Sequence, residues 1–144
     1  MLVKLLPDQI SKHWPTIKLG MDNSLPPTVA GSDEDRGNNM LRALLTDRAQ
    51  CWISNENGTG VNGMLITTIS QDKVSGTKSL LIYCLYAFGK TYKETWVEGF
   101  ETIKRFAKGE GCHRIVGYTA EPKIREIVDK LGGSTKYTFV SLEV

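Results

Sequence analysis

The C-terminal half of the chain shows the clearest alternation of apolar and polar segments. The apolar run 80–88 predicts a buried strand, and the polar turn 89–94 leads into an amphipathic helix that ends near Lys108. Gly109 and Gly111 follow that helix and stop it. A strand, a helix and a last strand are then expected over residues 113–118, 121–131 and 136–144.

The N-terminal half begins with a strand at 2–6 and a helix that opens at Pro7. Pro15 lies inside the helical pattern and predicts a kink or a break into two short pieces. Residues 22–32 are rich in proline and glycine, so they predict the longest loop of the chain. Loops of this length in compact domains are often functional.

A second helix is expected after this loop. Ser32 and Asp35 have the spacing of a capping box, with Ser32 as the N-cap. A buried stripe follows at helical spacing, formed by Met40, Leu41, Leu44 and Leu45. Gly37 weakens the first turn, so a helix that begins near Asn39 is the alternative.

A hairpin completes the predicted sheet, with strands at 51–54 and 61–70 around a turn at 55–60. The expected order of elements is therefore β-α-α-β-β-β-α-β-α-β. This order predicts an α+β fold, with one mixed, twisted sheet of about six strands and helices on both faces. No boundary or repeat divides the chain, so one domain spanning 1–144 is expected.

Composition narrows the range of partners. A net charge of +2 is too small to indicate a nucleic-acid partner. No apolar run reaches the roughly 20 residues that a bilayer crossing needs, so no membrane partner is expected. The first residues do not form a secretory signal, which predicts a cytoplasmic protein or one packaged from the cytosol. Cys51, Cys84 and Cys112 lack metal-ligand spacing, so we expect buried hydrophobic side chains and no metal.

Two local features accompany the order of elements. The strand at 80–88 runs through a short polar turn into a helix, and the final helix ends in Lys130-Leu131-Gly132. In its order and in these features the chain resembles the GNAT N-acetyltransferase family. The resemblance implies that acetyl-CoA lies in a V-shaped gap between the fourth and fifth strands, with its pyrophosphate at a helix N-terminus.

The resemblance assigns the cofactor contacts to two segments. The pantetheine arm of acetyl-CoA would pair with the backbone of the fourth strand at Leu85, Tyr86 and Ala87. The turn that would hold the pyrophosphate contributes Gly89, Lys90, Thr91, Tyr92, Lys93 and Thr95. The lysines supply positive charge, whereas the threonines either donate to phosphate or only cap the helix.

The turn departs from the family pattern, which has the form Arg/Gln-x-x-Gly-x-Gly/Ala. Residues 93–96 contain no glycine, and Glu94 adds a carboxylate near the expected phosphates. The proton-donating tyrosine of the family's last helix is also missing, because Ile127 and Val128 occupy its neighbourhood.

The family also needs a base for the acceptor amine, and the strand at 80–88 has no carboxylate, so Tyr86 and Tyr118 are the remaining candidates for a catalytic role. Alternation along the strand places Tyr83 and Cys84 on opposite faces, with Tyr86 on the face of Cys84. The structural alternative for both catalytic candidates is a packing residue with a hydrated hydroxyl.

Three functional hypotheses follow. The first is an acetyl-CoA-dependent N-acetyltransferase that admits a small-molecule or protein amine past the loop at 22–32. The second is a catalytically inactive GNAT-fold binding or assembly protein with protein partners, similar to virion or internal components of bacteriophages. The third is an unrelated α+β domain that binds a nucleotide or phosphate at the same turn.

Overall fold

The computed structural model describes residues 1–55 and 60–144, so most of the expected hairpin turn at 55–60 lies outside the described residues. The elements are β1 (Leu2–Lys4), α1 (Pro7–Asp22), α2 (Asp33–Leu45), β2 (Ala49–Asn55), β3 (Val61–Gln71), β4 (Lys78–Ala87), α3 (Lys93–Gly109), β5 (Arg114–Gly117) and α4 (Pro122–Lys130). Apart from the expected last strand, this is the predicted order.

The strands form one mixed sheet with the order β1-β2-β3-β4-β5. Successive strands from β1 to β4 pair antiparallel, whereas β4 and β5 pair parallel. A parallel pair needs a long crossover, and α3 supplies it. The predicted α+β architecture is therefore confirmed, with five strands in the described chain.

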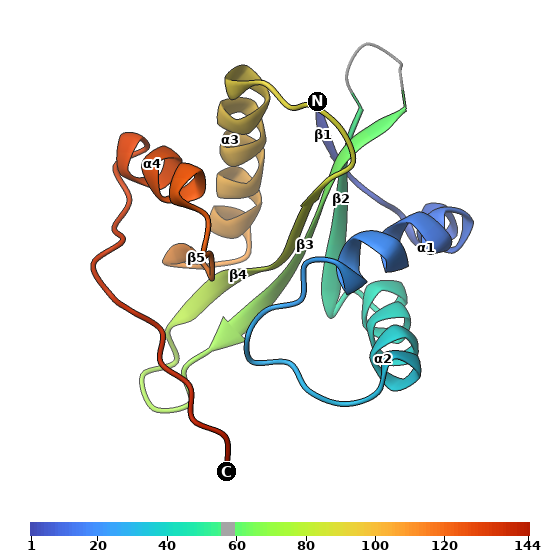
Figure 1. Cartoon of the computed structure of the whole chain (residues 1–144), viewed down its shortest axis with the longest axis horizontal. Helices are drawn as coiled ribbons and strands as arrows, with labels where there is room; N and C mark the ends of the chain where they lie inside the picture. The colour runs from blue at the N-terminus through green and yellow to red at the C-terminus, as the bar shows by residue number, and fades with distance from the viewer. Residues whose placement is uncertain (56–59) are drawn as a thin grey trace.

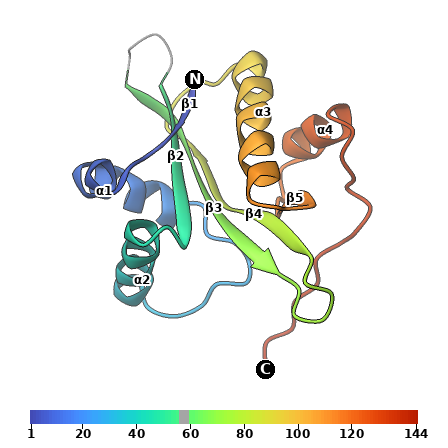
Figure 2. The same cartoon turned by 180° about the vertical axis from the view of Figure 1, so that it is seen from behind.

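Helices cover both faces of the sheet. Figures 1 and 2 show α1 and α2 on one face and α3 and α4 on the other. Alternation along β2 directs Cys51 into the core beneath α1 and α2, and Trp52 into the core beneath α3. The Trp52 ring meets Phe106 of α3 edge-on, with 5.1 Å between ring centroids.

The two N-terminal helices are more regular than the sequence indicates. α1 runs without a break through Pro15, and Ile10, Ile17 and Met21 bury one face of it. Burial of that face offsets the hydrogen bond that proline removes. Ser32 caps α2 as predicted, because the Asp35 N–H donates to Ser32 Oγ at 3.2 Å.

The expected strand at 136–144 is wrong for the single chain. No backbone hydrogen bond joins this segment to another part of the chain that the structure describes. Strand-forming side chains indicate extended backbone, but a strand also needs a neighbouring edge in register, which local pattern cannot supply. The segment leaves α4 and runs past the end of the sheet to the C-terminus (Figure 1).

Candidate functional site

The sheet opens between β4 and β5. β4 pairs with β3 along its whole length, from Lys78 to Ala87. It pairs with β5 only from Ser79 to Ile82. The last pair joins Ile82 to Gly117, the final residue of β5. Over 83–87 the β5 side of β4 therefore has no strand partner among the described residues. Backbone N–H and C=O groups on such an edge need other partners, and an extended ligand can supply them.

A β-bulge lies at the point of opening. Ile66 pairs with Cys84 and Thr67 with Ile82, so Tyr83 is the extra residue in β4. A bulge bends its strand and increases the local twist, which fits the divergence from β5. Tyr83 packs against the same core cluster as Cys84, so the opposite-face expectation fails at the bulge. Tyr86 shares that cluster with Cys84, as expected.

Tyr83 lies close to a charged residue that sequence reasoning missed. Burial and the neighbouring Cys84 raise the pKa of Tyr83, while the Arg36 guanidinium opposes the rise. Arg36 donates to the Gly31 carbonyl at 2.6 Å and pairs with Asp33, but its buried Nε has no partner within the described chain. The only sequence signal was an arginine four residues before the buried Met40.

The polar turn after β4 is anchored at its start. The Phe88 and Gly89 N–H groups both donate to the Asn62 carbonyl, at 3.0 and 3.4 Å. A Cβ at Gly89 would meet no atom within 4 Å, so the space beside this residue is open. The turn is therefore held to β3 on one side, and no atom packs against Gly89 on the other.

The N-terminus of α3 has no side-chain cap. Tyr92 is the N-cap residue, and no side-chain hydrogen bond caps the helix. The expectation that Thr91 or Thr95 caps it is wrong, because the Thr91 hydroxyl accepts from Trp96 Nε1 at 3.1 Å. Within the described residues, no acceptor meets the N–H groups of the first turn, residues 93–95. Such groups, with the helix dipole, attract anions.

Charges of both signs surround this helix end. Lys90, Lys93 and Glu94 are exposed, and no ion pair joins them to the described chain. Lys90 lies over the exposed Tyr92 ring, with 5.5 Å from Nζ to the ring centroid. The two lysines therefore face solvent beside the helix end, where they favour an anion and Glu94 opposes one.

The two candidate catalytic tyrosines lie on the two strands that diverge. Tyr86 is half-buried in the unpaired stretch of β4 and meets Phe88 edge-on, with 5.0 Å between centroids. Tyr118 follows β5 directly, is 44% exposed, and meets Phe139 at the same separation of 5.0 Å. Leu85 and Ala87 alternate with Tyr86 and are exposed. The structure thus places these candidates along the opening without bringing the tyrosines into contact.

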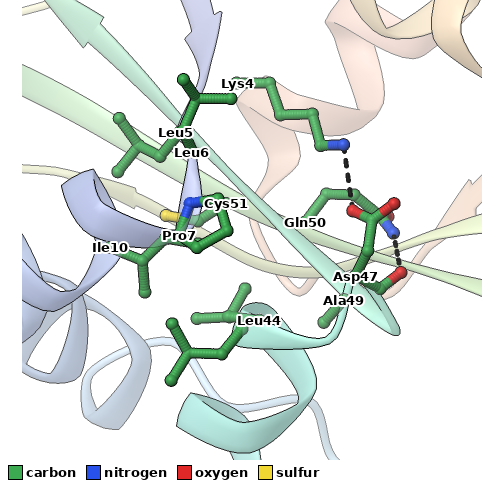
Figure 3. Close-up of a pocket in the computed structure, with 11 residues that line it drawn as sticks. Lys4, Leu5, Leu6, Pro7, Ile10, Leu44, Asp47, Ala49, Gln50 and Cys51 are labelled. Atoms are coloured by element: carbon green, nitrogen blue, oxygen red, sulfur yellow. Dashed lines mark hydrogen bonds and ion pairs between the residues drawn. The ribbon is translucent and has the colours of Figure 1, made fainter.

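A separate pocket lies on the other side of the sheet. It has a volume of about 160 Å³ and lies between the start of α1 and the end of α2. Figure 3 shows its apolar wall, which includes Leu5, Ile10, Leu44 and Cys51. Burial raises the pKa of the Cys51 thiol to about 12, so this thiol stays protonated and is no nucleophile at neutral pH.

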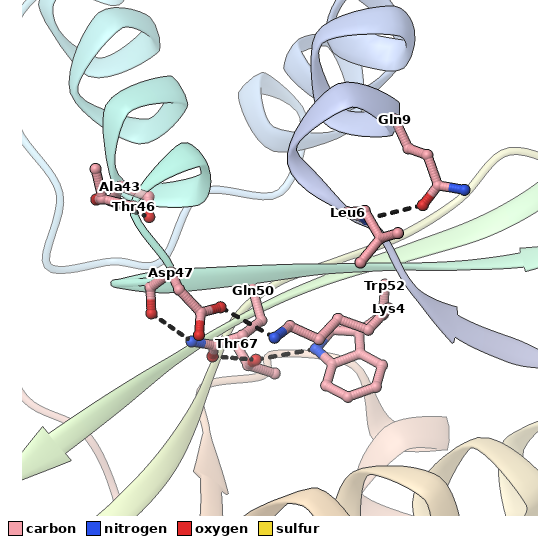
Figure 4. A network of polar contacts seen from close by, with 9 residues as sticks. All are labelled: Lys4, Leu6, Gln9, Ala43, Thr46, Asp47, Gln50, Trp52 and Thr67. Atoms are coloured by element: carbon pink, nitrogen blue, oxygen red, sulfur yellow. Dashed lines mark hydrogen bonds and ion pairs between the residues drawn. The ribbon is translucent and has the colours of Figure 1, made fainter.

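Buried polar groups near this pocket satisfy one another (Figure 4). Trp52 Nε1 donates to Thr67 Oγ1 at 3.0 Å, and Thr67 Oγ1 donates to Gln50 Oε1 at 3.0 Å. Gln50 Nε2 donates to the Asp47 carbonyl at 3.1 Å, and Lys4 pairs with the Asp47 carboxylate at 3.0 Å. A network without an unpaired member serves to hold β2 and β3 in register.

The described residues lack two further features. They contain no group of three or more His, Cys, Asp or Glu side chains placed to hold a metal ion. None of their helices combines the length and the apolar character that a membrane span requires.

No family model and no curated protein matches the sequence. Solved structures do match. An aminoglycoside acetyltransferase, HMB0005 from an uncultured soil metagenomic sample, has a TM-score of 0.72 at 15% identity, with 100% of this chain and 97% of that chain covered. A predicted acetyltransferase from Clostridium acetobutylicum, solved with acetyl-CoA, has a TM-score of 0.70 at 16% identity, with 99% and 95% covered.

A third structure, a ribosomal-protein-alanine N-acetyltransferase from Brucella melitensis biovar Abortus 2308, has a TM-score of 0.66 at 10% identity, with 100% and 99% covered. These similarities extend over essentially the whole of each chain. The chain has the GNAT fold. Within the GNAT fold, the opening between β4 and β5 and the N-terminus of α3 occupy the positions expected from the sequence.

Proposed function

We propose that the protein is an acetyl-CoA-dependent N-acetyltransferase. The proposal rests on two neighbouring stretches of backbone whose hydrogen-bonding groups have no partner among the described residues. The unpaired edge of β4 at 83–87 leads, through one short turn, to the uncapped N-terminus of α3. A ligand with an extended amide-bearing arm and a pyrophosphate complements both surfaces at once.

Two segments would hold the cofactor. Backbone groups of Leu85, Tyr86 and Ala87 lie where an extended arm would pair with β4. The pyrophosphate would lie at the turn, within reach of Gly89, Lys90, Thr91, Tyr92, Lys93 and Thr95. The open space beside Gly89 and the free N–H groups of the first turn of α3 fit an anion.

Acetyl transfer also requires a group that gives a proton to the departing sulfur. The bound cofactor supplies an acetyl thioester, and the chain must orient the acceptor amine and return a proton to the departing sulfur. Tyr86 on β4 and Tyr118 after β5 flank the opening and are the candidates for that proton. Two of the matching solved structures are named as an aminoglycoside acetyltransferase and as a ribosomal-protein-alanine N-acetyltransferase, so we propose an amine acceptor of small-molecule or protein type.

Titration calorimetry with acetyl-CoA and with coenzyme A tests the proposal first. Micromolar binding of both is expected, with Lys90→Ala and Lys93→Ala each weakening it about two- to fivefold, the effect of one charge at a helix N-terminus. Lys108→Ala, at the opposite end of the same helix, is the matched control and leaves affinity unchanged. No heat and no thermal shift at millimolar ligand would overturn the proposal and favour the inactive binding protein.

Glu94 gives a test of opposite sign. Its carboxylate opposes an anion at the first turn of α3, so Glu94→Gln is expected to tighten coenzyme A binding about two- to fivefold. Glu101→Gln, on an exposed later turn of α3, is the control. Weaker binding by the Glu94 variant would place the pyrophosphate elsewhere.

Acetyl transfer to a panel of amines, including aminoglycosides and peptides with N-terminal alanine, tests catalysis. Loss of the general acid is expected to lower kcat about 10²- to 10⁴-fold in Tyr86→Phe or in Tyr118→Phe, with cofactor affinity unchanged. Tyr137→Phe, on an exposed hydroxyl of the C-terminal segment, is the control. Unaltered kcat in both test variants would remove both tyrosines from the mechanism.

A further inference from the structure

A side-chain hydrogen bond closes the turn between β4 and α3. Trp96 Nε1 donates to Thr91 Oγ1 at 3.1 Å, in a contact that is partly buried. The backbone N–H of Trp96 also donates to the Tyr92 carbonyl at 3.3 Å, which is the first hydrogen bond of the helix. Trp96 therefore ties the two residues that precede α3 to the first turn of that helix.

The positions of the two bonded side chains are those that fix the start of many helices. Thr91 directly precedes the N-cap residue Tyr92, and Trp96 is the fourth residue of the helix. Apolar side chains at these two positions often pack against each other and fix the angle at which the chain enters the helix. Here a hydrogen bond joins the two positions. It holds the same entry angle, and with it the directions of the N–H groups of residues 93–95.

This hydrogen bond consumes none of the donors that the turn can offer to an anion. A serine, threonine or aspartate at the N-cap would accept from an N–H group of the first turn, whereas Tyr92 makes no such bond. An indole N–H can only donate, so the Thr91 oxygen is the acceptor and its hydroxyl proton is left over. Among the described residues, no acceptor takes that proton. Thr91 thus carries a hydroxyl with a fixed oxygen and a proton to donate.

The other end of the turn is held as well. The N–H groups of Phe88 and Gly89 donate to the Asn62 carbonyl, so the segment is fixed to β3 at its start and to α3 at its end. Glycines in the GNAT pattern let the backbone approach a phosphate closely, but residues 93–96 contain none. A turn without those glycines needs another means of holding its donors in place, and the bond from Trp96 provides one.

We propose that Trp96 is a positioning residue, whose indole N–H holds the Thr91 hydroxyl and the first turn of α3 in place for the pyrophosphate of acetyl-CoA. This role rests on the proposed function and adds to it a residue that itself touches no ligand. The Thr91 hydroxyl donates to a phosphate oxygen, and Trp96 acts through Thr91. Because the two side chains act as one unit, the effects of changing them are not additive.

Titration calorimetry with coenzyme A and with inorganic pyrophosphate tests the proposal. Thr91→Val removes the hydroxyl at constant size and should weaken both ligands about tenfold, the loss of one hydrogen bond to a charged group. Trp96→Phe removes the indole N–H and should weaken both about two- to tenfold, the loss of one hydrogen bond between neutral groups. The double variant should bind like Thr91→Val. Thr91→Ser keeps the hydroxyl and should retain the wild-type affinity within about twofold.

A ligand without the pyrophosphate separates positioning from general structural damage. Acetyl-pantetheine keeps the amide-bearing arm and the thioester, so its affinity should be the same in the wild type and in both single variants. Trp14→Phe on α1 and Thr102→Val on a later turn of α3 are the matched controls and should bind every ligand like the wild type. An equal loss of acetyl-pantetheine and coenzyme A affinity would overturn the proposal. So would undiminished coenzyme A binding by Trp96→Phe.

The hydrogen bond itself is measured without a ligand, by exchange of the Trp96 indole N–H with solvent in NMR spectra. Exchange should be slow in the wild type and faster in Thr91→Val, a small change that keeps the test open if Trp96→Phe does not fold. Equal exchange in the two proteins would overturn the proposal.

The two ligands distinguish failure of the positioning role from failure of the proposed function. Pyrophosphate binding that depends on Thr91 and Trp96, without any binding of coenzyme A, would reject the acetyltransferase and support the positioning role. Coenzyme A binding that depends on neither residue would do the reverse. A wild type that binds neither ligand would overturn both.

Discussion

The core beneath α1 and α2 and the region of β5 and α4 differ in how completely their side chains are buried. Beneath α1 and α2, the core residues Ile10, Ile17, Met21 and Ile66 have at most 2% of their surface exposed. On the other face Leu80 and Ile103 are also buried, but β5 and α4 bury no residue fully. The first region supplies a rigid frame. The second holds the opening, the free helix end and the unpaired segment, which fits the rule that functional elements come from less stable parts.

The largest expected effect comes from removing a side chain of the rigid frame. Ile17→Ala should lower the free energy of unfolding by about 3 kcal/mol, because it leaves a cavity where 1% of the side chain is exposed. Ile127→Ala, on the half-buried face of α4, is the matched change and should cost less than about 1 kcal/mol. Urea denaturation measures both. Equal losses would contradict the contrast between the two regions.

Alkaline pH should weaken the same frame. Burial raises the pKa of Cys51 to about 12 and that of Cys84 to about 11, from an ordinary 9.0. Both pKa values are higher in the folded state, so their stabilising effect is complete below pH 9 and is lost as pH rises toward 11. Over that range each thiol lowers the free energy of unfolding by about 1.4 kcal/mol per pH unit.

Urea denaturation at pH 8, 9 and 10 checks this expectation. The variant with Cys51→Ala and Cys84→Ala is less stable at every pH, but its loss between pH 9 and 10 should be smaller by about 2 kcal/mol. An identical pH dependence in the two proteins would show that these thiols do not govern alkaline stability.

A smaller effect is expected at Gly20, where α1 packs against Met64 of β3. A Cβ at Gly20 would lie 2.2 Å from the sulfur of the buried Met64, so Gly20→Ala forces that side chain to move. A loss of about 1–2 kcal/mol should follow from this overpacking. Gly109→Ala, where nothing lies within 4 Å, is the control and should be nearly neutral. Thermal unfolding of the two variants distinguishes close packing from a general intolerance of alanine.

Local signals in the chain were enough for most of the fold. Ser32 marked the start of α2, and the apolar periods placed every helix and the strands of the five-stranded sheet. The kink or break predicted at Pro15 is wrong, because burial of one face of α1 keeps the helix continuous. The strand predicted at 136–144 is also wrong, since strand-forming side chains do not by themselves provide a neighbouring edge to pair with.

The candidate site was only partly predictable. The turn after β4 and the helix that follows it were evident from polarity and spacing. Three properties were not: the bulge at Tyr83, the uncapped end of α3, and the position of Arg36 near Tyr83. Each depends on contacts between residues far apart in the chain, or on which of several possible hydrogen bonds forms.

The sequence by itself determined the order of elements, the two apolar faces of the sheet and the polar turn before α3, because these follow from the period of apolar residues and from local turn chemistry. Only the tertiary structure decided where β5 leaves β4 and that residues 136–144 stay unpaired. Strand register and edge pairing are set by packing between distant segments, and the opening that defines the site is a property of that register.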